Sequence, residues 1–162
     1  MRESLSPLRA MIGARFIVVE ANAERDGRLE IIIALEDQGW VEAELEAGGA
    51  VRTGPLLDGG SSFTLPDGST LDVIAAERDW LAQALDCPRI APNGLPVIGL
   101  PYFVLFRLET ARTADLRKLE RLLGSTTDVE LGRVRNAVDA YMPDSRGDLE
   151  SLIVLGRLAR GG

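Results

Sequence analysis

The stretch LPVIGLPYFVLFRLETARTAD, Leu95 to Asp115, decides how the rest of the chain is arranged. A short apolar run, Pro96 to Leu100, ends at Pro101, and proline suits the first position of a helix because its φ is already helical. Tyr102 to Leu108 then predict a largely buried helix. Thr113 is placed to cap a second helix. Two guanidinium groups and a carboxylate belong to this segment: Arg107, Arg112 and Asp115.

Composition and charge describe an ordinary acidic globular chain. The 162 residues are 46% hydrophobic and 27% charged, with a formal net charge of −7. A chain of this size buries about 70% of its unfolded surface, so a true core is expected. Duplex nucleic acid is not expected as a partner, because no basic patch offsets the repulsion from phosphates.

Several classes of site are excluded by the residues that are missing. Cys87 is the single cysteine, and the chain contains no histidine. An intrachain disulfide, the usual zinc sites and histidine-based catalysis are therefore excluded, and any metal would have to bind through carboxylates. No apolar run approaches the ~20 residues of a membrane span, and the N-terminus lacks a signal-peptide core. We expect a cytoplasmic protein that does not bind membranes.

The first hundred residues predict a mixed sheet with flanking helices. Leu5, Leu8 and Ile12 have helical spacing, with Gly13 at the C-terminal cap. The expected strands are Phe16 to Val19, Leu29 to Leu35, Val51 to Thr53, Ser62 to Leu65 and Thr70 to Ala75, with a turn at Pro66-Asp67-Gly68. Helices are expected over Glu36 to Ala47, which includes Trp40, Val41 and Leu45, and around Trp80, Leu81 and Leu85. Both tryptophans are interpreted as core or half-buried residues.

The C-terminal part predicts helices only. Apolar stripes are formed by Leu116, Leu119, Leu122 and Leu123, by Leu131, Val134, Val138 and Tyr141, and by Leu149, Leu152, Ile153 and Leu158. Thr127 with Glu130, and Ser145 with Asp148, have the spacing of capping boxes. We therefore expect an α/β (α+β) unit over residues 1–100, a mixed sheet flanked by helices, and a helical segment over residues 101–162 packed with it as one body.

This order of elements and one sequence pattern resemble small bacterial nucleotidyltransferase-like proteins. The pattern is L-P-x-h-h-L-h-[KR]-L followed by R-x-x-D-L. It is present here as Leu100-Pro101, Leu105-Phe106-Arg107-Leu108, Arg112 and Asp115-Leu116. The resemblance covers residues 14–124, and it implies the polymerase-β-type fold, including the toxin-related branch linked to abortive-infection proteins.

In that family the chemistry is two-metal phosphoryl transfer. It uses a Gly-Gly or Gly-Ser turn, a D-h-D pair on a strand, and a third aspartate on a neighbouring strand, because carboxylates two residues apart share a face and hold Mg²⁺ together. Glu20-Ala21 stands at the turn here, where an acid disfavours phosphate. Glu30-Ile31-Ile32 keeps one carboxylate of the pair, and Asp72 matches the third acid. The resemblance therefore implies a degenerate site, with Glu30 and Asp72 as vestigial candidates and no metal.

Each of these residues has a structural alternative. Asp72 could be an edge or solvated acid on the face of Thr70 and Ile74. Arg107 and Arg112 are candidates for binding a nucleotide or phosphate. Arg107 could equally snorkel from a buried helix or pair with Asp115 or Glu109, and we favour the pair. Asp115 could also pair with Arg112 at i, i+3, so Asp115 is interpreted as a structural pair member.

Three functions remain open. The first is a catalytically degenerate nucleotidyltransferase-fold protein that serves as a binding or regulatory module, with no cofactor. The second is an active transferase that binds Mg²⁺ through a rearranged carboxylate set such as Glu20, Asp26, Glu30 and Asp72. The third is a protein-interaction partner, antitoxin-like or a homodimer, marked by an exposed apolar patch. We favour them in that order, so activity as a nucleotidyltransferase is not expected.

Overall fold

A computed structural model describes residues 6–22, 28–57, 59–110 and 113–161. Leu5, Asp26 and Arg112 lie outside the described residues. The chain forms two compact units, Met1–Ile98 and Gly99–Gly162. Whether the two units pack as one body stays a prediction. No described helix is long and apolar enough to cross a membrane.

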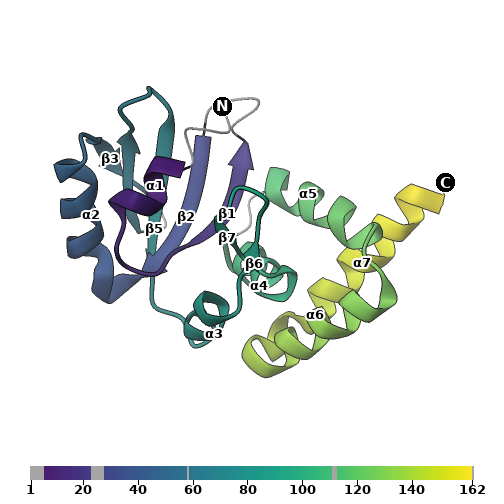
Figure 1. Ribbon diagram of the computed structural model, residues 1–162. Coiled ribbons are helices and arrows are strands. Elements are labelled where there is room, and N and C mark those ends of the chain that lie inside the picture. Colours follow the sequence, from purple (N-terminus) through teal and green to yellow (C-terminus); the bar gives the residue numbers. More distant parts are fainter. Residues whose placement is uncertain (1–5, 23–27, 58, 111–112, 162) are drawn as a thin grey trace. The chain divides into compact units, whose positions relative to one another are not determined.

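The first unit is built on a seven-stranded mixed sheet with the order β3-β4-β5-β2-β1-β7-β6 (Figure 1). Its strands are β1 (Ile17–Asn22), β2 (Arg28–Ala34), β3 (Val51–Pro55), β4 (Gly60–Thr64), β5 (Thr70–Ala76), β6 (Arg89–Ile90) and β7 (Pro96–Val97). Strand β2 pairs antiparallel with β1 and parallel with β5. The strands expected at Phe16 to Val19, Leu29 to Leu35 and Thr70 to Ala75 correspond to β1, β2 and β5. The prediction that these three strands share one sheet is confirmed.

The core of this unit covers one face of the sheet. Alternate residues of β2 and β5 contribute Leu29, Ile31, Ile33, Leu71 and Val73. They are covered by Leu8 of α1 (Ser6–Met11), by Ile12 directly after that helix, and by Val41 and Leu45 of α2 (Gln38–Ala47). These side chains repeat every second residue on the strands and every fourth on α2, so the binary pattern alone places them.

Trp40 does not join this core, contrary to the expectation. The chain makes a 3-10 turn, Leu35–Asp37, before α2 begins at Gln38. Val41 and Leu45 are four residues apart and fully buried, and Trp40 precedes Val41 by one position, which turns it about 100° away from the core. Its side chain is 68% exposed, whereas Trp80 is buried as expected.

The segment from Cys87 to Gly94 contains a strand that the sequence did not predict. Strand β6 pairs antiparallel with β7, through Arg89 with Val97 and Ile90 with Pro96. It is preceded by the short helix α3 (Leu81–Asp86). Two-residue strands carry no measurable alternation, so periodicity could not find them. The two edges of the sheet are therefore β3, which has a register shift between Arg52 and Gly54 and ends at Pro55, and the very short β6.

The described residues of the second unit form only helices and the turns between them. They are α4 (Leu100–Thr110), α5 (Thr113–Gly124), α6 (Asp128–Tyr141) and α7 (Arg146–Gly161). Thr127 is the N-cap of α6, since its Oγ1 accepts a hydrogen bond from the Glu130 N–H at 3.3 Å, as expected. The prediction that Leu158 belongs to the last apolar stripe was wrong, because its side chain is 67% exposed. The buried positions of α7 are Leu149, Ile153 and Gly156.

Helices α5 and α7 meet at two glycines. A Cβ on Gly124 would overlap the carbonyl oxygen of Gly156, and a Cβ on Gly156 would overlap the carbonyl oxygen of Glu120. The backbones are therefore in direct contact, a separation that any side chain at either position would prevent. No apolar stripe indicates such a contact, because glycine contributes nothing to hydrophobic periodicity.

Candidate functional site

A row of polar residues crosses four neighbouring strands of the first unit. Ser62 on β4 is in register with Asp72 on β5, Asp72 with Glu30 on β2, and Glu30 with Glu20 on β1. Residues that pair across adjacent strands lie on the same face of a sheet. We call Ser62, Asp72, Glu30 and Glu20 the polar row. Its members on β2, β4 and β5 lie on the face opposite Leu29 and Ile31.

Asp72 is the centre of this row, and both oxygens of its carboxylate accept hydrogen bonds. Its Oδ1 accepts from Ser62 Oγ at 2.7 Å, and its Oδ2 accepts from Arg28 Nε at 3.0 Å. Asp72 is only 6% exposed and lies on an interior strand. The interpretation of Asp72 as an edge or solvated acid was therefore wrong. A buried carboxylate needs charge compensation, and the Arg28 guanidinium supplies it.

Arg28 and Ser62 were missed by the sequence reasoning, although each had a signal. Arg28 stands two residues before Glu30 on the same strand, so it shares the face of Glu30. Ser62 follows from the turn at Pro66-Asp67-Gly68, because the hairpin that pairs Thr64 with Thr70 also pairs Ser62 with Asp72. The parallel register between β2 and β5, which brings Arg28 to Asp72, had no signal in the sequence.

Next to the polar row, the same face is apolar. Ile32 on β2 pairs with Ile74 on β5, and these residues are 0% and 7% exposed. Ile32 therefore lies where the family's second carboxylate was expected, on the face of Glu30. Within the described part of the chain, no group of three or more Asp, Glu, Cys or His residues is placed to hold a metal ion. Glu30 itself has an interaction within the protein.

In the second unit, Arg107 lies on α4 with its side chain enclosed. It is 9% exposed, and its guanidinium carbon is 5.3 Å from the ring centroids of both Phe103 and Phe106. Aromatic faces attract a guanidinium group, so the two rings stabilise this buried charge. Asp115 is half-buried in the first turn of α5. The roles of Arg107 and Arg112 as phosphate ligands, and of Asp115 as a pair member, stay predictions.

These features define an α/β protein with a mixed sheet, flanking helices and a helical C-terminal segment, as the sequence predicted. No model of a known protein family matches the sequence, and no curated protein matches it. Among solved structures, the chain is similar to the antibiotic-resistance factor ANT(2'')-Ia in its solution structure. That likeness covers 99% of this chain and 94% of the other, at 15% identity and a TM-score of 0.48.

Proposed function

We propose that this protein is a catalytically degenerate nucleotidyltransferase-fold protein that acts as a binding or regulatory module. The resemblance in the sequence supplies the class, and the polar row supplies the reason for degeneracy. A transferase of this type needs carboxylates that are free to coordinate two Mg²⁺ ions and to bridge them. This chain has one matching acid on β2, one on β5, and an arginine that is bonded to the second of them.

One observation carries the proposal: both oxygens of Asp72 are engaged, by Arg28 and by Ser62. A cation that approached Asp72 would have to displace a guanidinium group that already neutralises it. Ile32 and Ile74 leave no further carboxylate on that side of Glu30. A lone Mg²⁺ would therefore keep most of its water ligands and would bind weakly.

The direct test measures metal binding and nucleotidyl transfer together. We expect no tight Mn²⁺ binding by calorimetry and no transfer of labelled nucleoside monophosphate from any of the four nucleoside triphosphates. Micromolar Mn²⁺ affinity or labelled product, lost in Asp72→Asn, would contradict the proposal. An effect that Asp72→Asn leaves unchanged would come from another site.

The Arg28→Ala variant tests the effect of the arginine on metal binding separately from that of the carboxylates. If Arg28 is what prevents metal binding, this variant should bind Mn²⁺ more tightly than the wild-type protein. Arg52→Ala is the matched control, because Arg52 Nε donates to Ser61 Oγ at 3.0 Å and its removal changes the net charge equally without touching Asp72. Equal Mn²⁺ affinity in Arg28→Ala and the wild type would mean that the small number of carboxylates, and not Arg28, limits metal binding.

A second candidate function is an active transferase with a rearranged carboxylate set. The register of Glu20, Glu30 and Asp72 on three neighbouring strands favours it, because the three Cα atoms follow one line across the sheet. The fourth expected member, Asp26, lies outside the described residues. Activity that required Glu20 and Glu30 as well as Asp72 would promote this candidate.

A role as a protein-interaction partner is favoured by the outer face of α7. Val154, Leu155 and Leu158 are 55%, 50% and 67% exposed and lie within two turns of that helix. Large apolar side chains that gather on an exposed face mark interaction sites. Concentration-dependent mass in light scattering, lost in Leu155→Lys, would support self-association.

A further inference from the structure

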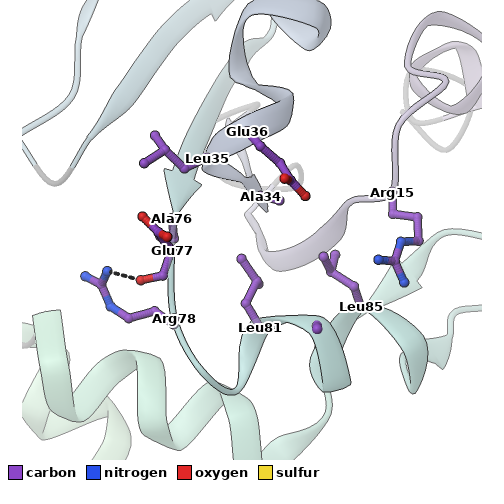
Figure 2. Close-up of a pocket in the computed structure, with 10 residues that line it drawn as sticks. Arg15, Ala34, Leu35, Glu36, Ala76, Glu77, Arg78, Leu81 and Leu85 are labelled. Atoms are coloured by element: carbon purple, nitrogen blue, oxygen red, sulfur yellow. Dashed lines mark hydrogen bonds between the residues drawn. The ribbon is translucent and has the colours of Figure 1, made fainter.

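A cavity of about 380 Å³ lies in the first unit at the carboxyl ends of β2 and β5 (Figure 2). Leu35 and Glu36 line it directly after β2, Glu77 and Arg78 directly after β5, and Leu81 and Leu85 from α3. Figure 2 shows both leucines pointing from α3 toward the end of β2, where Glu36 lies. Small-molecule sites begin at about this volume.

The topology explains why a cavity forms there. Strands β2 and β5 are adjacent and parallel, so their carboxyl ends meet at one edge of the sheet. After β2 the chain enters α2, which packs on the core face. After β5 it enters α3, whose buried residues Leu81, Ala84 and Leu85 do not belong to that core. The chain thus leaves the two strands in different directions, and crevices at such switch points are where open α/β sheets bind ligands.

The lining combines an apolar floor with four charged side chains, the carboxylates of Glu36 and Glu77 and the guanidinium groups of Arg15 and Arg78. Leu81 and Leu85 are 4% and 8% exposed. Among the described residues, the side-chain carboxylates of Glu36 and Glu77 have no hydrogen-bond or ion-pair partner. Arg15 is paired with the carboxylate of Asp86, whereas Arg78 donates to a neutral group, the carbonyl oxygen of Glu77, at 2.8 Å.

The surrounding sequence adds to the negative potential. Asp37 follows Glu36, and Asp79 follows Arg78. The whole chain carries a net charge of −7. Five carboxylates at or beside the cavity, those of Glu36, Asp37, Glu77, Asp79 and Asp86, thus outnumber its two arginines. An excess of one sign of charge over apolar walls concentrates ligands of the opposite sign. A ligand that fits must therefore bring a positive charge to Glu36 and Glu77 and an apolar surface to Leu81 and Leu85.

We propose that this cavity binds a small organic cation, a protonated amine on a compact apolar body. The apolar body rests on Leu81 and Leu85, and the ammonium group donates charge-assisted hydrogen bonds to the carboxylates of Glu36 and Glu77. The site does not depend on the function proposed above. Asp72 pairs with Glu30, four residues before the end of β2 at Ala34, which is about 13 Å along the strand.

Phenethylamine is a suitable probe, with 2-phenylethanol and 3-phenylpropanoate as neutral and anionic comparators of similar size. Binding is measured by calorimetry and by the shifts of backbone amide signals in NMR spectra of the full chain. We expect the amine to bind at millimolar concentrations or below, to shift the signals of Leu81 and Leu85, and to bind more tightly than the alcohol. The carboxylate should bind least.

Two variants and one control make the test specific. Glu36→Gln with Glu77→Gln should weaken amine binding by about tenfold and bring its affinity to that of the alcohol. Ala82→Phe, on the exposed side of α3, should fill the cavity and abolish binding of all three probes. Glu46→Gln on α2 makes the same charge change away from the cavity and should leave amine affinity unaltered.

The proposal is overturned by any of three results. Phenethylamine does not bind, the comparators bind as tightly as the amine, or the shifted signals lie outside the cavity. Equal amine affinity in the wild type and in the Glu36→Gln, Glu77→Gln variant would overturn the assignment of these carboxylates as well. Since none of these substitutions touches Asp72 or Arg28, failure here leaves the metal and transfer experiments unaffected.

Discussion

Arg28 is the residue on which the polar row depends. It compensates a carboxylate that is 6% exposed, whereas its own side chain is 57% exposed. The energetic consequence falls on Asp72, because removal of one partner leaves the other buried without a counter-charge. The family pattern alone presents Asp72 as a remnant of a metal site. Its contacts show that it also has a structural partner.

We therefore expect Arg28→Ala to lower the free energy of unfolding by about 2 kcal/mol, since a buried charged acceptor loses a charge-assisted hydrogen bond. Asp72→Asn with Arg28→Ala should cost less than the sum of the two single changes. Urea denaturation of the four proteins in this double-mutant cycle measures the coupling. Strict additivity would show that the ion pair contributes nothing to stability.

Arg107 illustrates a different case, a buried guanidinium between aromatic rings. Arg107→Met should leave the thermal midpoint within a few degrees of the wild type, or raise it, because an apolar side chain replaces a charge that is costly to bury. If Arg107 instead binds phosphate, the same variant should lose any thermal shift that a nucleotide produces. A large fall in the midpoint without nucleotide would mean that the contacts of the guanidinium with its surroundings are essential to the fold.

At the scale of elements, the contact between α5 and α7 is the most sensitive feature of the second unit. Gly124→Ala should lower the free energy of unfolding by about 1–3 kcal/mol. The new methyl group would overlap backbone atoms of Gly156, and backbone atoms cannot move aside by a change of rotamer. Gly132→Ala on α6 is the matched control. Nothing lies within 4 Å of a Cβ there, so the change should stabilise by up to about 1 kcal/mol through helix propensity. Equal effects of the two changes in thermal unfolding would contradict the close contact.

Helices α6 and α7 are joined by an ion-pair network around Glu150. Its carboxylate accepts from Arg135 Nε at 2.6 Å and Nη2 at 3.1 Å, and from Arg146 Nε at 2.9 Å. The hydrogen bonds from Arg135, followed by those from Arg146, lower the pKa of Glu150 from 4.5 to about 2. A lowered pKa in the folded state means that the ionised carboxylate favours folding.

The pH dependence follows from that direction. Above pH 4.5 the contribution of Glu150 is fully present, and it is lost as the pH falls from 4.5 toward 2, where the folded protein also takes up the proton. The side chain is 37% exposed, so solvent screening limits the contribution to about 1 kcal/mol. Glu150→Gln should therefore lower stability at pH 7 and reduce its loss between pH 5 and pH 2. An unchanged acid limb in urea titrations would contradict this.

For the whole molecule, the sequence predicted the structure correctly where apolar residues repeat at a regular spacing, and it did not where such a repeat is absent. The apolar density of β2 and β5 predicted that they share a sheet, and the alternation of their residues placed Asp72 on the face of Thr70 and Ile74, and Ile32 on the face of Glu30. The parallel pairing of those strands, which brings Arg28 to Asp72, is a non-local contact without a turn to set its register. Trp40 was misplaced because it directly precedes Val41 on α2, and successive residues of a helix are turned about 100° from one another. Gly156 was overlooked because a glycine leaves no apolar mark. The sequence thus identified the acids of the candidate site, Glu30 and Asp72, whereas Arg28 and Ser62, the partners of Asp72, were identified only in the structure.

The two edges of the sheet have a consequence for the behaviour of the protein at high concentration. An exposed edge strand offers free N–H and C=O groups to another chain, and regular edges template the growth of aggregates. Strand β3 is largely exposed, but its register is broken between Arg52 and Gly54, and Pro55 removes a donor. At the other edge, β6 has only two residues. Both edges therefore resist the addition of a further strand. Any contact between copies of this chain must then be made by side chains, and fibril-like growth from the folded state is disfavoured.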